Sequence, residues 1–464
     1  MKKTIEYLLI FSFFIFSGCS QSPTETDEGI TFSGTVTLEG ETDYSGVTIS
    51  LYEPVELDTA LLRVNQQYPN IGIQISQEIA FDYRKQTAVK SNTSNTGGSW
   101  KIAGVKAGTY HIVAEKDGFG WEIVYNKQSG STHFELNKEV ILTSMTGSEY
   151  TFESGKTYVI KNQDVFLLDM NSLNFEAGSK IVFTSNNDLN IINSQVVFLN
   201  SGWVDITGDP GITNAKMIVE GSSVFISGLK FYAMNNGITF NDCSKSIIQN
   251  SYFSRNGKAF LPEFCDSMRV ENIIVANNTD GILPQAGNMT ITNNIFYNNN
   301  KGLESLTSAI QLSNSLFLEN FIGATFISGN KSRVEYCEFD RNENSSLNII
   351  GVSLFIFHNN FKNDKNCSIY VGSEYQSTDV CKPRINYNNL FGDKYAVSQL
   401  GNPYYSGLNY GNYFSIDASV NYWDSVIEAE IQIRIYDFYD DEGIGKVEYP
   451  PYRLFRIADT GIQK

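Results

Sequence analysis

Histidine, basic charge and long apolar runs are scarce in this sequence of 464 residues. Its 3 histidines are scattered, at His111, His133 and His358. No nucleophile elbow, zinc motif, phosphate loop or dinucleotide fingerprint occurs. These absences argue against most enzyme classes, against a nucleotide partner and against a metal site.

Basic residues are also outnumbered by acidic ones. The sequence has 34 Lys and Arg against 51 Asp and Glu, which gives a formal net charge of −17. Such a charge disfavours nucleic acid and anionic membrane surfaces as electrostatic partners. It also disfavours bulk attraction of acidic polysaccharides, although a local basic strip or bound calcium can reverse this within a groove.

A short apolar run stands near the start of the chain, from Tyr7 to Phe16. It is too short to span a membrane and is typical of a secretory signal. The small residues that lead to Cys19 resemble a bacterial lipobox. This resemblance implies a lipoprotein signal peptide over 1–18, a lipid on the thiol of Cys19 and a polar tether over 19–29. An ordinary signal peptide with a chance cysteine is the alternative.

The second half of the chain contains a ladder of short repeated segments, and each segment ends on an apolar anchor. Successive anchors stand 21 or 22 residues apart, at Phe231, Phe253, Val275, Phe296, Phe317, Phe339 and Phe361. A further anchor, Phe391, follows after a step of 30. Alternating runs such as Met289–Thr292 precede the anchors, and a second apolar run begins seven residues after them. Such repeats predict a solenoid with about three short strands per coil, whose coils pair in parallel.

Asparagine recurs beside the anchors, for example at Asn293 and Asn314. Asparagine tolerates the left-handed backbone that a tight corner needs, and its amide can hydrogen-bond the asparagine of the next coil. His358 takes the place of such an asparagine, so we expect it to be a corner residue rather than a catalyst.

These repeats resemble the right-handed parallel β-helix superfamily, the fold of pectate lyases, over residues 150–424. The resemblance implies an all-β solenoid, preceded by a connector over 127–149 and closed by a C-terminal cap over 425–464. It does not imply one activity, because this scaffold carries lyases, hydrolases, adhesins and passive spacers alike.

The region 30–126 lacks the coil repeat and consists of short strands that end at turns. Its closing strands, which include Gly108–Ala114, are similar to the carboxypeptidase regulatory-like domain, a prealbumin-like β-sandwich. A longer insertion between Glu53 and Asn92 departs from that family and contains a helix-like stretch, 57–67. The fold class expected is therefore all-β, with a small β-sandwich followed by a right-handed parallel β-helix.

The cysteines beyond Cys19 belong to an exported, oxidising setting if the signal is correct. Cys243 and Cys265 stand 22 residues apart, so they stack on neighbouring coils as either a disulfide or a ladder of free thiols. Cys367 and Cys381 bracket the extra residues of one coil, and we predict a disulfide between them.

The strands after each anchor form the face on which β-helix enzymes of this superfamily bind polymers. Alternation turns Thr239, Asn241, Glu263, Gln285 and Glu304 outward on that face. The insertion 366–384 adds two tyrosines beside it, Tyr370 and Tyr375, either as a ligand lip or as decoration of the solenoid.

Lys258, Asp280 and Lys301 stack at the edge of this face, at steps of 22 and 21 residues. Lyase chemistry on an acidic sugar needs a base and a cation. A lysine at this position can supply both, and Asp280, Glu263 and Glu304 beside it can contribute by holding calcium. The alternative is a charge-balanced ladder that avoids like charges between coils. No Asp pair recurs on adjacent coils, so the catalytic residues of family lyases cannot be assigned here.

The sequence as a whole predicts an exported, lipid-anchored protein of the bacterial cell envelope, at the outer membrane or cell surface. Its β-helix is expected to be a binding or structural module, with a carbohydrate polymer as the partner. The alternative is a polysaccharide lyase or glycoside hydrolase that acts in the β-helix groove. No cofactor is expected, and calcium enters only if the chain is a lyase.

Overall fold

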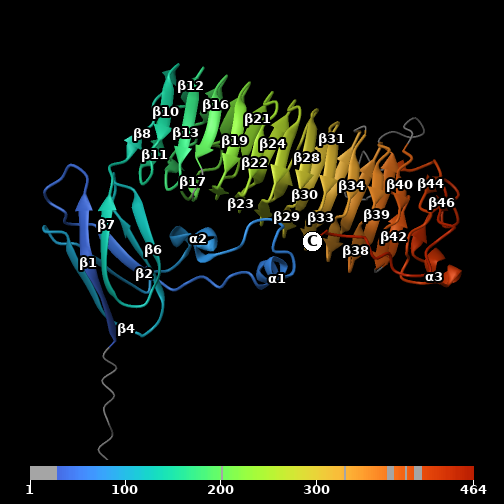
Figure 1. Cartoon of the computed structure of the whole chain (residues 1–464), viewed down its shortest axis with the longest axis horizontal. Coiled ribbons are helices and arrows are strands. Elements are labelled where there is room, and N and C mark those ends of the chain that lie inside the picture. Colours follow the sequence, from blue (N-terminus) through green and yellow to red (C-terminus); the bar gives the residue numbers. More distant parts are fainter. Residues whose placement is uncertain are drawn as a thin grey trace, which may run out of the picture.

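The computed structural model describes residues 29–199, 202–328, 331–373, 381–391, 394–401 and 410–463. The described chain is all-β, with a small sandwich followed by a long parallel solenoid (Figure 1). Cys19 and Tyr375 lie outside the described residues. Within those residues, no helix combines the length and apolar character needed to cross a membrane.

The sandwich has two sheets, with the strand orders β4-β1-β7 and β3-β2-β5-β6. The strands are β1 (Ile30–Leu38), β2 (Thr48–Tyr52), β3 (Lys90–Thr93), β4 (Ser99–Val105), β5 (Tyr110–Glu115), β6 (Trp121–Lys127) and β7 (Gly130–Leu136). Phe32, Trp100 and Phe134 pack between the sheets and are at most 4% exposed. The region predicted as a connector contains β7, which pairs in parallel with β1, so the sandwich extends to Leu136.

The insertion between β2 and β3 forms three short helices, α1 (Thr59–Gln67), α2 (Gln77–Ala80) and the 3-10 helix η1 (Tyr83–Lys85). The expected helix over 57–67 is confirmed as α1. Asp58 begins it, because its carboxylate accepts the amide hydrogens of residues 60 and 61 at 2.8 and 3.1 Å.

Three parallel sheets form the solenoid, and each regular coil contributes one strand to each sheet. Sheet I contains β10 (Glu149–Phe152), β13 (Ser172–Glu176), β16 (Gln195–Leu199), β19 (Ser223–Ser227), β22 (Ile247–Gln249), β25 (Met268–Glu271), β28 (Asn288–Thr292), β31 (Ala309–Ser313), β34 (Arg333–Glu335), β37 (Phe355–Phe357), β40 (Arg384–Asn386), β44 (Ile416–Asp417) and β46 (Val447–Glu448). Sheet II contains β8 (Val140–Ile141), β11 (Thr157–Ile160), β14 (Lys180–Phe183), β17 (Val204–Gly208), β20 (Leu229–Tyr232), β23 (Tyr252–Ser254), β26 (Ile274–Ala276), β29 (Ile295–Tyr297), β32 (Leu316–Leu318), β35 (Glu338–Asp340), β38 (Asn360–Lys362) and β41 (Asn389–Phe391). Sheet III contains β9 (Met145–Thr146), β12 (Val165–Leu168), β15 (Leu189–Ile192), β18 (Met217–Glu220), β21 (Ile238–Asn241), β24 (Lys258–Glu263), β27 (Asp280–Ile282), β30 (Lys301–Leu306), β33 (Ile322–Ile327), β36 (Ser345–Ile350), β39 (Cys367–Ser373), β42 (Tyr395–Ser398), β43 (Tyr410–Gly411) and β45 (Ile435–Tyr436).

The insertion helices cover the outer face of sheet II. Leu61, Val64 and Ile71 from the insertion pack with Ile274 and Leu316 of the sheet in one apolar cluster. Figure 1 shows α1 and α2 lying along this side of the solenoid. Because sheet II is covered in this region, sheet III is the broader candidate surface for a ligand.

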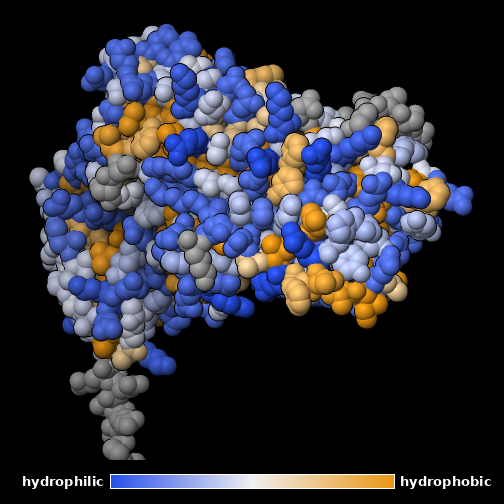
Figure 2. Space-filling model, turned by 45° about the vertical axis from the view of Figure 1, so that its right-hand side comes forward, coloured by the Kyte–Doolittle hydropathy of each residue, from blue (hydrophilic) through white to orange (hydrophobic). Residues whose placement is uncertain are grey.

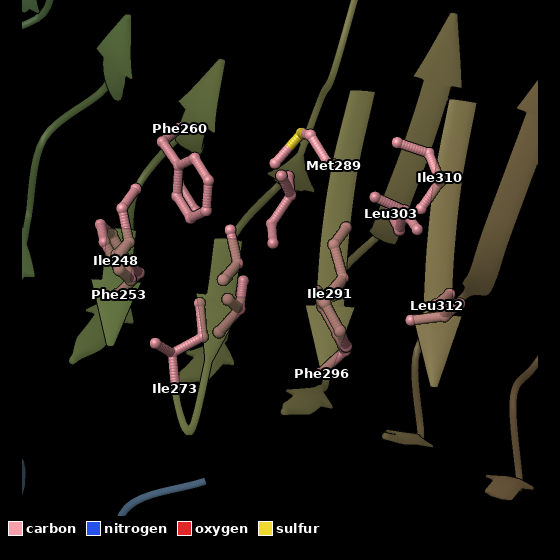
Figure 3. Packing of buried hydrophobic residues seen from close by; sticks show 14 of the residues in the cluster. Ile248, Phe253, Phe260, Ile273, Met289, Ile291, Phe296, Leu303, Ile310 and Leu312 are labelled. Atoms are coloured by element: carbon pink, nitrogen blue, oxygen red, sulfur yellow. The ribbon is translucent and has the colours of Figure 1, made fainter. Parts of the chain in front are cut away.

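The predicted anchors fill the interior of the coils. The rings of Phe296, Phe317, Phe339 and Phe361 stack with centroid separations of 4.5, 4.8 and 4.9 Å. Figure 3 shows the labelled apolar side chains pointing from the coil walls into the same interior. This spacing is the distance between neighbouring strands, so the aromatic stack follows directly from the repeat.

The corners between sheets use left-handed residues, as expected. In one coil these are Asn293, Asn298 and Thr307, with φ of 59°, 50° and 53°. The amide of Asn314 donates to the side-chain oxygen of Asn293 at 2.6 Å, which confirms the predicted contact between corner asparagines. His358 is a corner residue too, with φ of 57°.

A second asparagine ladder lies inside the solenoid and was not predicted. Asn278, Asn299 and Asn320 are at most 3% exposed. The amide of Asn299 donates to the oxygen of Asn320 and to the carbonyl of Val275, at 3.0 and 2.9 Å. The ladder ends at Asp364, where burial raises the pKa of the carboxyl to about 8. Each amide therefore satisfies backbone groups that the tight corner leaves inside the core.

The predicted disulfide between Cys367 and Cys381 is wrong. Both residues are buried thiols, and each donates to a backbone carbonyl, of Ile369 at 3.3 Å and of Val352 at 3.2 Å. Cys367 begins the seven-residue strand β39, which is about 20 Å long. Cys381 lies beyond the opposite end of the strands of sheet III, so the two thiols are too far apart for a disulfide.

Cys243 and Cys265 are also thiols rather than a disulfide. Each donates to the carbonyl two residues before it, at 3.5 and 3.4 Å. Ser222 makes the same bond through its hydroxyl at 2.8 Å. The two cysteines therefore act as serine equivalents at this corner.

Apolar side chains are exposed on the C-terminal cap, which contains α3 (Glu428–Gln432). Ile433 is 73% and Phe455 is 82% exposed. Figure 2 shows apolar residues gathered along the lower edge of the view, on the side where α3 lies.

Candidate functional site

A row of charged side chains runs across sheet III where the sequence predicted it. Lys258, Asp280 and Lys301 are partners on β24, β27 and β30. The ammonium group of Lys301 bonds both carboxylate oxygens of Glu304 at 2.9 Å. We call these four residues the sheet III strip. Opposite charges alternate along it, so each carboxylate lies beside a cation.

Asp280 lies in the middle of the strip, between Lys258 and Lys301. Burial raises the pKa of its carboxyl, Lys301 and Lys258 oppose the rise, and Glu304 adds to it. Glu304, by contrast, is held by Lys301 as a bidentate acceptor. The strip therefore offers hydrogen-bond acceptors and ammonium donors, and the ammonium group of Lys301 is engaged by Glu304.

The other predicted surface residues form a second row beside the strip. Asn241, Glu263 and Gln285 pair on successive coils and are half-buried. Thr239, also half-buried, lies on β21 as the partner of Leu261. Amide, carboxylate and hydroxyl groups thus occupy one continuous face, as the alternation predicted.

Tyr370 does not contribute an exposed ring to this face. It lies on β39, only 6% exposed, and its hydroxyl accepts a hydrogen bond from the amide of Asn366 at 2.9 Å. The outward neighbour Asn348 on the preceding coil is fully buried as well. The expectation that Tyr370 binds a ligand at the surface is therefore not supported by its position.

A groove opens beside the strip at the corner between sheets II and III. Its volume is about 630 Å³, and its lining includes Asn300, Phe321 and Lys365. Asn300 directly precedes Lys301, and Phe321 directly precedes Ile322, the partner of Lys301 on the next coil. The groove therefore lies next to the strip, and its lining ends at the residue before Lys301.

Ion pairs between neighbouring coils form the outer wall of this groove. Arg341 bonds Glu319 at 2.9 Å, and Lys365 bonds Glu343. These residues were not predicted from the sequence, although their fixed spacing from the anchors could have identified them. Asn277, Asn298, Glu319 and Arg341 stand two residues after successive anchors, all with positive φ.

A second lysine and aspartate column lies on sheet II and was also missed. Lys180, Asp205 and Lys230 are partners on β14, β17 and β20. The Lys180 ammonium donates to the carbonyl of Trp121 at 2.8 Å, and Lys230 donates to those of Glu78 and Phe81 at 3.0 and 3.2 Å. Burial lowers the pKa of both lysines, and Asp205 opposes this. This column attaches the sandwich and its insertion to the solenoid.

The three histidines lie apart from the strip. His111 is buried in the sandwich, bonded to Gln77 at 2.9 Å, and burial lowers its pKa to about 4. His133 lies on β7, and His358 stacks between Tyr336 and Tyr387 at 5.1 and 5.6 Å. Among the described residues, no group of three or more His, Cys, Asp or Glu side chains is placed to hold a metal ion.

Comparison with known proteins bears on the fold. A family model described as "Right handed beta helix region" matches residues 159–334. The sequence matches no curated protein.

Among solved structures, the catalytic domain of a GH87 alpha-1,3-glucanase in complex with tetrasaccharides is 10% identical, over 93% of this chain and 88% of that one, with a TM-score of 0.35. The periplasmic alginate epimerase AlgG is 9% identical over 65% of this chain and 76% of that one, with a TM-score of 0.28. At this similarity neither structure bears on the activity or substrate of this chain. The right-handed β-helix rests on the family model and the strand pairing.

Proposed function

We propose that this chain is an exported, lipid-anchored protein of the bacterial cell envelope that binds a carbohydrate polymer along the sheet III strip and its adjoining groove. The observation that carries the proposal is the continuous row of Lys258, Asp280, Lys301 and Glu304, beside a groove of about 630 Å³ whose lining includes Asn300, the residue before Lys301. Carboxylates and ammonium groups in such a row can both accept from and donate to sugar hydroxyls.

Binding accounts for the geometry better than catalysis does. The Lys301 ammonium already bonds both oxygens of Glu304, so it is not free to neutralise the carboxylate of an acidic sugar, as lyase chemistry requires. One observation favours the enzyme alternative, a polysaccharide lyase or glycoside hydrolase. The raised pKa of Asp280 is a property of acid catalysts in clefts.

Replacing Lys301 by alanine separates the two functions. For a binding protein we expect polymer affinity to fall about three- to tenfold, because one charged hydrogen-bonding group among several is lost. Affinity electrophoresis against neutral and acidic polysaccharides measures this. Lys138→Ala is the matched control, since Lys138 pairs with Glu41 at 2.8 Å on the sandwich, away from sheet III. Release of unsaturated uronides or new reducing ends by the unchanged protein, abolished in Lys301→Ala, would instead establish an enzyme.

The anchor is tested separately at Cys19. We expect Cys19→Ala to lose palmitate labelling in cells and to leave the membrane fraction, because the acceptor thiol is gone. Cys243→Ser is the control, since Cys243 is a buried corner thiol in a position that serine fills elsewhere. Continued labelling of the Cys19→Ala chain would remove the lipid anchor from the proposal.

A further inference from the structure

The seam between the sandwich and the solenoid contains a pocket that is distinct from the sheet III strip. Its volume is about 290 Å³. Strand β6 of the sandwich supplies Trp121, Glu122 and Tyr125. Sheet II supplies Lys180 and Asp205, and Trp203 directly precedes its strand β17. Figure 1 shows β6 on the side of the sandwich that faces the first coils. The pocket exists only when both parts are in place.

Asp205 is the residue that points to a ligand. Its Oδ1 atom is buried and has no hydrogen-bond partner. The lysines on the coils either side direct their ammonium groups to other acceptors, Lys180 to the carbonyl of Trp121 and Lys230 to carbonyls of the insertion. A buried carboxylate oxygen without a donor is unfavourable, and a ligand hydroxyl that donates to it removes that cost.

The rest of the pocket limits the chemistry of the ligand. Trp121 and Trp203 provide flat apolar surfaces, and the Lys180 ammonium lies 5.3 Å from the Trp121 ring centroid. An organic cation is disfavoured, because Lys180 already occupies that role beside the ring. An anion is disfavoured by Glu122 and Asp205. A neutral ring that carries several hydroxyls satisfies both the carboxylates and the ammonium, and it can place its C–H face against an aromatic ring.

Tyr125 also lines the pocket and packs against other rings. Its ring packs edge-on against Phe81 and His111 at centroid distances of 6.1 and 5.1 Å. Burial raises the pKa of its hydroxyl, and the nearby Asp205 raises it further. The hydroxyl therefore remains protonated at neutral pH.

We propose that this seam pocket binds a single neutral saccharide unit, with Asp205 as the hydroxyl acceptor and the two tryptophans as the apolar walls. This site goes beyond the polymer-binding strip and does not depend on it. The strip lies on sheet III, whereas the pocket is formed by sheet II and the sandwich.

Tryptophan fluorescence of the purified protein tests the proposal directly. We expect a saturable change with at least one of glucose, galactose, mannose or N-acetylglucosamine, titrated past a Kd of about 1 mM. Asp205→Asn keeps the side-chain shape and should weaken that binding about tenfold or more. Trp203→Leu should abolish it, and Trp121 still reports in that variant. Unfolding midpoints identify which variants are folded, and either folded variant decides the question.

Asp280→Asn is the matched control, because Asp280 stands in the same kind of Lys–Asp–Lys column on sheet III. It should alter polymer binding and leave the monosaccharide titration unchanged, so the two proposals fail independently. The pocket proposal is overturned if no neutral sugar gives a saturable signal, if choline or glucuronate binds in preference to all of them, or if either Asp205→Asn or Trp203→Leu is folded and binds as the unchanged protein does.

Discussion

Replacing Asp364 by asparagine is expected to stabilise the protein at neutral pH. Asp364 is 1% exposed, and burial raises its carboxyl pKa to about 8 from an ordinary value of 3.8. The folded protein therefore holds a proton that the unfolded chain releases. The contribution of this carboxyl to the free energy of unfolding is most favourable below pH 4 and declines as pH rises towards 8. At pH 7 the loss is on the order of 4 kcal/mol.

The asparagine ladder shows why the substitution fits. The amide of Asn342 donates to the carbonyl of Phe317 at 3.2 Å, and that of Asn320 donates to the carbonyl of Phe296 at 2.9 Å. An asparagine at 364 can continue this pattern to the carbonyl of Phe339. Its oxygen can keep the bond that the backbone N–H of Asn342 now donates to Asp364, with an N···O distance of 3.1 Å.

Urea unfolding midpoints at pH 5, 7 and 9 measure the effect. The gain in Asp364→Asn should grow between pH 5 and 8 and then level off. Asp340→Asn is the control, because Asp340 pairs with Arg341 at the surface at 3.4 Å, and such pairs contribute about 1 kcal/mol or less. Parallel pH profiles for the unchanged protein and Asp364→Asn would show that the buried carboxyl is not protonated.

The sequence allowed the coil interior and the sheet III face to be predicted because one physical constraint repeats there. Each coil must bury one anchor and turn its neighbours outward, so Phe296, Phe317 and Phe339 determine the register of the residues that follow them. Lys258, Asp280 and Lys301 could be placed side by side on this basis alone. The ion pair between Lys301 and Glu304 could not be predicted, since it depends on side-chain conformation rather than on the period of the repeat.

Features that depend on contacts between distant segments were missed. Asp205 lies 25 residues from both Lys180 and Lys230, a spacing that does not fit the later steps of 21 or 22. The docking of α1 on sheet II is likewise invisible to periodicity, although the helix itself could be predicted. The proposed Cys367 and Cys381 disulfide failed for a related reason. Spacing in the chain does not indicate at which end of the strands each cysteine lies.

Neutralising Asp82 is expected to loosen the attachment of the insertion to the solenoid. Asp82 is 3% exposed, bonds Arg84 at 3.1 Å and pairs with Arg255 of the solenoid at 3.4 Å. Lys230 lies close enough for Asp82 to raise its pKa. Asp82→Asn keeps the size of the side chain but leaves these three cations facing one another, and loss of one partner from a buried ion pair costs about 3–5 kcal/mol.

Asp209→Asn is the matched control for this experiment. Asp209 lines the same seam beside Arg84, but burial raises the pKa of its carboxyl. The site therefore does not favour the negative charge of Asp209, and removing that charge should change the free energy of unfolding little. We expect Asp82→Asn to lower the urea midpoint and to expose the insertion, residues 53–89, to proteolysis, while Asp209→Asn does neither. Equal behaviour of the two variants would show that apolar packing of α1 on sheet II, rather than the ion pairs, holds the two parts together.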